Sequence, residues 1–137
     1  MHRKILMGGL CFCFLAVLLG AFGAHALKSM VLPDRLLLFE TGVRYQFMHG
    51  MALIALSIYG SQNHAKLGEQ KGIEWAFIFF ISGIIFFSGS LYLLVLATIL
   101  NGTWSNFVGP ITPLGGLFFM LGWISWLRVV FKDKVDK

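Results

Sequence analysis

Charged residues are scarce in this chain of 137 residues: only 12% of the sequence is charged, whereas 58% is hydrophobic. Soluble domains carry about 25% charged residues, so a chain this apolar would expose large hydrophobic patches in water. The scarcity of charge therefore excludes an ordinary soluble domain and predicts an integral membrane protein. The formal net charge of +5 does not indicate nucleic-acid binding, because the basic residues lie mainly in the tails and short loops.

Cysteine is also scarce, with Cys11 and Cys13 as its two instances. Because they lie two residues apart in an apolar run, a helix points them to different faces and they cannot pair with each other. A zinc site would need further ligands nearby. The two residues are interpreted as small apolar side chains of a helix, and neither a metal site nor a cofactor is predicted.

Long apolar runs are abundant, and four of them are predicted to cross the membrane within one domain. The spans are placed at about residues 5–27, 41–60, 74–100 and 113–131. The first run begins like a secretory signal, but its apolar part exceeds the roughly 7–15 residues of a signal core, so it is interpreted as a retained helix. The fold class is thus an all-α membrane protein, a four-transmembrane-helix bundle.

The second span is the least regular, because its charge-free part, 45–59, is shorter than the minimum of about 17 residues for a spanning helix. The helix must draw on the preceding residues, which brings Arg44 and Glu40 to the membrane boundary. Their spacing of four predicts that they lie side by side on a helix and form a pair. Before them, Pro33 predicts the start of a short interfacial helix, Asp34 to Phe39, that continues into the second span or bends at Gly42.

The remaining connections are predicted from polar residues and turn signals. Ser61 to Gly72 is polar and is interpreted as a solvated loop, and Lys132 to Lys137 as a solvated tail. Before the fourth span, Thr112 is the expected N-cap and Pro113 the first helical residue. Trp123 and Trp126 are expected near the closing membrane interface, where such rings commonly lie.

Basic residues are distributed unevenly between the two sides that four spans define. One side holds eight and the other holds three, and the side with more basic residues faces the cytoplasm in most membrane proteins. The eight are Arg3, Lys4, Lys66, Lys71, Arg128, Lys132, Lys134 and Lys137, and the three are Lys28, Arg35 and Arg44. Both termini are therefore predicted to be cytoplasmic.

Polar residues that are scattered along the sequence gather, in this topology, in one layer toward the outer leaflet. They form the candidate polar cluster, which consists of His25, Glu40, Arg44, Tyr45, Gln46, His49, Ser88, Ser90, Tyr92 and Thr112. One interpretation is structural, because polar side chains inside a bundle hydrogen-bond neighbouring helices. The other is a binding site, since ionisable groups in a membrane often mark ion or ligand pathways.

Four sequence blocks resemble a known family. These are Gly20-Ala-Phe-Gly-Ala-His25, Thr41-Gly-x-x-Tyr45-Gln46-x-x-His49, Phe87-Ser-Gly-Ser-Leu-Tyr92 and Gly109-Pro-Ile-Thr-Pro-Leu-Gly-Gly116. In this order they are similar to the signature blocks of the domain-of-unknown-function 423 family, also named uncharacterised protein family 0382, whose eukaryotic branch is transmembrane protein 256. The resemblance implies a four-helix protein of the bacterial plasma membrane and carries no mechanism.

Several functions stay open at this point. A structural or assembly protein is the first hypothesis, with membrane lipids as partners and self-association or other membrane proteins contacted through small-residue faces such as Ala16, Gly20 and Ala24. The alternatives are binding of a lipid headgroup or small anion by Arg44, a proton or ion path, and a metal held by histidines. An enzyme is not expected, and no catalytic residue is assigned, since no G-x-S-x-G motif is present.

Overall fold

The computed structural model describes residues 1–62 and 67–135, and this part of the chain is helical nearly throughout and contains no β-strand. In chain order the elements are α1 (His2–His25), the 3-10 turn η1 (Leu27–Ser29), α2 (Pro33–Gln62), α3 (Leu67–Gly83), the π-helical segment η2 (Ile84–Ser88), α4 (Gly89–Ile99), α5 (Ser105–Val108) and α6 (Ile111–Val135). The predicted all-α fold is confirmed for the described residues.

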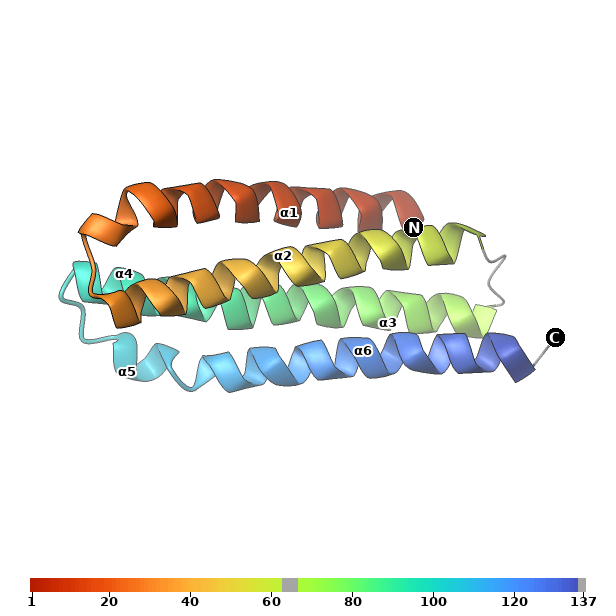
Figure 1. Cartoon of the computed structure of the whole chain (residues 1–137). Coiled ribbons are helices and arrows are strands. Elements are labelled where there is room, and N and C mark those ends of the chain that lie inside the picture. Colours follow the sequence, from red (N-terminus) through yellow and green to blue (C-terminus); the bar gives the residue numbers. More distant parts are fainter. Residues whose placement is uncertain (63–66, 136–137) are drawn as a thin grey trace.

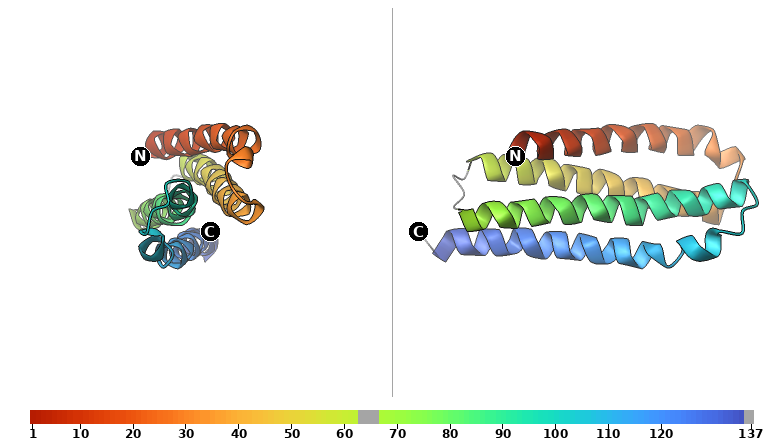
Figure 2. Two further views of the ribbon diagram at one scale, coloured as in Figure 1. Left: turned by 90° about the vertical axis from the view of Figure 1, so that its left-hand side faces the viewer. Right: turned by 180° about the vertical axis from the view of Figure 1, so that it is seen from behind.

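Four long rods lie side by side, and α3, η2 and α4 together make one of them (Figure 1). The two chain ends lie at the same end of the bundle, whereas η1 and α5 lie at the other. α1 packs on α2, α2 packs on η2 and α4, and α6 packs on α3 and η2. The rods therefore follow sequence order, and Figure 2 shows α1 and α6 on opposite sides of the bundle.

Three helical stretches of the described chain are long and apolar enough to cross a membrane: His2–Ser29, Glu69–Ile99 and Ile111–Lys132. α2 is not among them, although its 30 residues would extend about 45 Å at 1.5 Å per residue. The reason lies in its composition, because charged residues occupy its first turns and polar residues interrupt the apolar positions that follow.

The predicted short helix Asp34 to Phe39 is not a separate element, because α2 runs unbroken from Pro33 to Gln62. Helical hydrogen bonding begins at Leu32, the residue before α2, since the backbone N–H groups of Arg35 and Leu36 both donate to its carbonyl oxygen. Of the two predicted alternatives, continuation of this segment into the second long helix is therefore the one found, since α2 is unbroken at Gly42. The one short helix that separates α1 from α2 is the turn η1.

The ends of the other helices also differ from the prediction. α6 begins at Ile111, so Thr112 lies inside the first turn and is not an N-cap. The third apolar run is interrupted by η2, where the wider π-helical turn breaks the regular bonding. α2 and α3 extend into the predicted loop from both sides, and residues 63–66 of that loop, with 136–137 of the tail, lie outside the described residues.

The apolar core is divided into two clusters along the bundle. The larger one, near the end with the termini, is built on Leu53, Leu56, Ile73 and Phe80, and the smaller one, near η1, on Leu27, Phe39 and Val95. α2 contributes to both clusters. Its residues between Phe39 and Ala52 therefore form a layer between two hydrophobic cores, and the buried polar side chains of Gln46 and His49 lie in this layer. Two other buried polar residues, Ser57 and Glu69, lie outside it, toward the end with the termini.

Candidate functional site

Gln46 joins three helices at the middle of the bundle. Its side chain is 4% exposed, and its Nε2 donates a hydrogen bond to the Phe12 carbonyl oxygen of α1 at 3.0 Å. Its Oε1 accepts a hydrogen bond from the Tyr92 hydroxyl of α4, also at 3.0 Å. Gly42, one turn earlier, leaves room for the Tyr92 ring, because a Cβ at that position would lie 2.8 Å from Tyr92 Cε1. Gln46 is thus a structural tie between α1, α2 and α4.

His49 lies one turn further along α2 and is also 4% exposed. Its Nδ1 lies 2.9 Å from the Tyr45 carbonyl oxygen, and its Nε2 lies 3.3 Å from Trp123 Nε1 of α6. An indole N–H only donates and a carbonyl only accepts, so the proton of the neutral imidazole is on Nδ1 and the lone pair is on Nε2. The ring stacks on Phe119, with centroids 3.5 Å apart. Both nitrogens are therefore engaged: Nδ1 bonds the backbone of α2 itself, and Nε2 holds α2 to α6.

Two hydroxyl residues of the candidate polar cluster, Ser90 and Thr112, form a second tie, between α4 and α6. The Ser90 Oγ and the Thr112 Oγ1 lie 2.7 Å apart, and the Ser90 hydroxyl also lies 2.8 Å from the Phe87 carbonyl oxygen. Ser88 is fully buried, and its Oγ has no hydrogen-bond partner within the described part of the chain. Thr112 thus links two helices instead of capping one.

Three members of the candidate polar cluster do not join these interior contacts. His25 ends α1 and is exposed, and Glu40 and Arg44 are exposed on α2. No ion pair joins Glu40 to Arg44 in the structure as far as it is described, so the pair expected from their spacing is not formed. Five of the predicted residues, Gln46, His49, Ser90, Tyr92 and Thr112, therefore bond neighbouring helices, whereas His25, Glu40 and Arg44 lie on the surface. Tyr45 is exposed, and its ring packs against Phe87 and Phe119.

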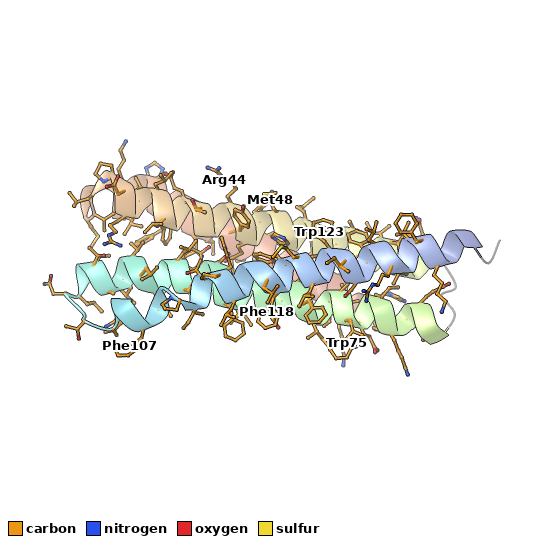
Figure 3. The ribbon with its side chains drawn as sticks, turned by 90° about the horizontal axis from the view of Figure 1, so that it is seen from below. Arg44, Met48, Trp75, Phe107, Phe118 and Trp123 are labelled. Carbon is orange, nitrogen blue, oxygen red and sulfur yellow. The ribbon has the colours of Figure 1, made fainter. Side chains whose placement is uncertain are left out.

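A lateral groove of about 930 Å³ lies between α2 and α6. Its lining is mostly apolar and includes Met48, Met51, Ala55, Leu117, Met120 and Trp123, with His49 in its wall. In Figure 3, Arg44, Met48 and Trp123 follow one another along the same side of the molecule, whereas Trp75, Phe107 and Phe118 lie on the other. Arg44 is not part of the lining, but it stands one helical turn before Met48 on α2 and so places a positive charge near the groove.

The sequence did not reveal that Trp123, predicted to lie near the membrane interface, donates a hydrogen bond to His49. A signal was present, because Phe119, Trp123 and Trp126 are spaced i, i+4, i+7 and so share one face of α6. The groove itself had no sequence signal, since it depends on how α2 and α6 are placed. Among the described residues, no group of three or more His, Cys, Asp or Glu side chains is placed to hold a metal ion.

The helical fold, the apolar spans and the polar layer between two hydrophobic cores define an all-helical membrane protein. Residues 19–116 match the model of DUF423, described as a protein of unknown function. The chain belongs to this family.

Relatives support the same assignment over nearly the whole chain. A UPF0382 membrane protein of Staphylococcus aureus (strain bovine RF122 / ET3-1) is 38% identical over 132 residues, which cover 96% of this chain and 98% of the relative. The UPF0382 membrane protein YwdK of Bacillus subtilis (strain 168) is 40% identical over 111 residues, 80% of this chain and 81% of the relative. One from Haemophilus influenzae (strain ATCC 51907 / DSM 11121 / KW20 / Rd) is 36% identical over 121 residues, 88% of each chain. No solved structure matches the chain.

Proposed function

We propose that this protein is a non-catalytic, four-span plasma-membrane protein with both termini in the cytoplasm, and that it works by contacting a partner inside the bilayer. The length of α2 and its position beside three apolar rods support a fourth span. The excess of basic residues on the side of the termini supports the orientation. In this orientation the first turns of α2, which include the predicted interfacial segment Asp34 to Phe39, lie toward the outer membrane interface.

A structural or assembly role accounts for the interior polar residues better than catalysis or transport does. Both polar atoms of the Gln46 side chain bond neighbouring helices, and His49 bonds Tyr45 of its own helix and Trp123 of α6. His49 has no free lone pair for a metal or for general-base work in this arrangement. Ser90 is engaged with Thr112. These bonds support packing as the role of the interior set, since such bonds between membrane helices stabilise a bundle by about 0.6–2 kcal/mol each.

The observation that carries the interaction role is the surface between α2 and α6. An apolar groove opens on it, and Glu40 and Arg44 are exposed on α2, two turns and one turn before Met48, without an ion-pair partner among the described residues. Ionisable side chains within a membrane are costly unless paired, so a face that carries both signs of charge favours a partner that neutralises them. The second candidate, binding of a lipid headgroup, is favoured by Arg44 near the groove.

A photo-reactive amino acid at Met48, on the wall of the groove, is expected to give a discrete adduct in native membranes. The matched control is the same amino acid at Leu18, which is exposed on α1, away from the groove. Mass spectrometry of the full chain after illumination identifies what is attached. The same mixture of adducts at both positions would contradict the proposed interaction surface.

A further inference from the structure

Glu40, Arg44 and Met48 succeed one another at intervals of four along α2, so they form one row on the exposed side of the helix. Met48 belongs to the wall of the groove, which continues along α2 through Met51 and Ala55. Along this row, counted from the groove toward the start of α2, the positive charge of Arg44 comes first and the negative charge of Glu40 second. The apolar groove, the cation and the anion thus lie in a fixed order along a single helix.

A zwitterionic phospholipid has the same sequence of groups, with the charges reversed. From the bilayer centre outward come its acyl chains, its phosphate and its ammonium group. This order is the same in either leaflet, so the match does not depend on which side of the membrane faces the cytoplasm. The Cβ atoms of Glu40 and Arg44 are about 5–6 Å apart on a helix, and two carbons separate the ammonium from the phosphate ester in ethanolamine lipids.

We propose that the groove between α2 and α6 holds a phosphatidylethanolamine molecule, with its phosphate on Arg44, its ammonium on Glu40 and an acyl chain between the two helices. The arginine fork binds phosphate by two parallel hydrogen bonds. The ammonium of ethanolamine donates hydrogen bonds that the Glu40 carboxylate accepts, whereas a choline group has no N–H to donate. A glycerol headgroup leaves the lipid with a net negative charge and gives Glu40 no cation to pair with.

The groove has the dimensions of a ligand site. Its volume of about 930 Å³ falls within the roughly 300–1,000 Å³ of small-molecule pockets. The flexible side chains of Met48, Met51 and Met120 adapt to an irregular apolar chain. A second copy of this protein fits less well, because two hollow faces brought together by a two-fold axis would enclose a larger void. The inference rests on the interaction surface proposed above and names its occupant.

The test uses the full chain in nanodiscs of equal parts phosphatidylethanolamine, phosphatidylglycerol and phosphatidylcholine, with native mass spectrometry of the lipids that the released protein retains. The wild-type protein is expected to retain phosphatidylethanolamine about fivefold over each of the other two, the upper end for one exposed ion pair. Glu40→Gln is expected to remove this preference while lipid is still retained. Arg44→Gln and Ala55→Phe are expected to lower retention of all three lipids, through loss of the phosphate contact and filling of the groove.

Matched controls are Glu74→Gln and Arg3→Gln, which remove exposed charges of the same kind elsewhere on the protein and are expected to leave retention unchanged. Equal retention of the three lipids by the wild-type protein, or a preference that survives Glu40→Gln, would overturn the proposal. A discrete protein adduct at Met48, with no lipid preference, would also overturn it while leaving the interaction surface itself in place. The two inferences can therefore fail separately.

Discussion

Replacing Gly115 with alanine is expected to lower the free energy of unfolding by about 3 kcal/mol, the upper end for overpacking. Gly115 lies in α6 where this helix meets η2, and a Cβ added there would stand 2.6 Å from the Cα of Phe87 and against its backbone nitrogen. Backbone atoms cannot move aside as the end of a flexible side chain can. The substitution must therefore push α6 away from η2 and loosen the Ser90–Thr112 contact beside it.

Gly116→Ala is the matched control, because the two glycines are adjacent in α6. A Cβ at Gly116 would meet only the Phe87 Cδ2 at 4.0 Å, an ordinary contact. Alanine is favoured over glycine in a helix by up to about 1 kcal/mol, so this variant is expected to be neutral or more stable. Thermal unfolding followed by circular dichroism in detergent compares the two. Equal stability of the two variants would contradict the close packing of α6 on η2.

Gln46→Leu is expected to lower the free energy of unfolding by about 1–2 kcal/mol, because it removes the hydrogen bonds that tie α2 to both α1 and α4. The Tyr92 hydroxyl then loses its acceptor inside the bundle. Tyr92→Phe removes that hydroxyl, so the double variant is expected to lose less than the sum of the two single losses.

Thr98→Val is the control for this loss. Its hydroxyl is exposed and donates to the Leu94 carbonyl within the same helix, so removing it breaks no tie between helices. Unfolding by a denaturing detergent, titrated for all four variants, measures the differences. A Gln46→Leu protein as stable as the Thr98→Val protein would show that Gln46 does not hold the bundle together.

The fold class could be predicted from the sequence because hydrophobicity along the chain directly reports burial in a membrane. Gln46 and His49 could also be singled out, since polar side chains in an otherwise apolar run need a partner. Their partners could not be predicted, because the Phe12 carbonyl and Trp123 are distant in sequence and meet them only through helix packing.

Residue spacing along a helix did not predict ion pairing correctly for exposed side chains, which can be solvated or bind other partners. Glu40 and Arg44 have the spacing of a helical pair, yet both are exposed and no ion pair joins them, consistent with the small free energy of such contacts. The π-helical turn at Ile84–Ser88 was not predicted either, although glycine and serine residues flank it on both sides. This wider turn lies against Gly115 of α6, where the two backbones pack closely at Phe87. Close packing of this kind cannot be predicted from residue type.

The proposed interaction surface depends on α2 crossing the membrane, and cysteine accessibility tests that most directly. In a chain with Cys11→Ala and Cys13→Ala, single cysteines are placed by Lys28→Cys, before α2, and by Lys71→Cys, after it; both positions are exposed. A membrane-impermeant maleimide applied to intact cells is expected to label position 28, and to label position 71 only after the cells are permeabilised. Labelling of both positions, or of neither, in intact cells would contradict the fourth span and the site built on it.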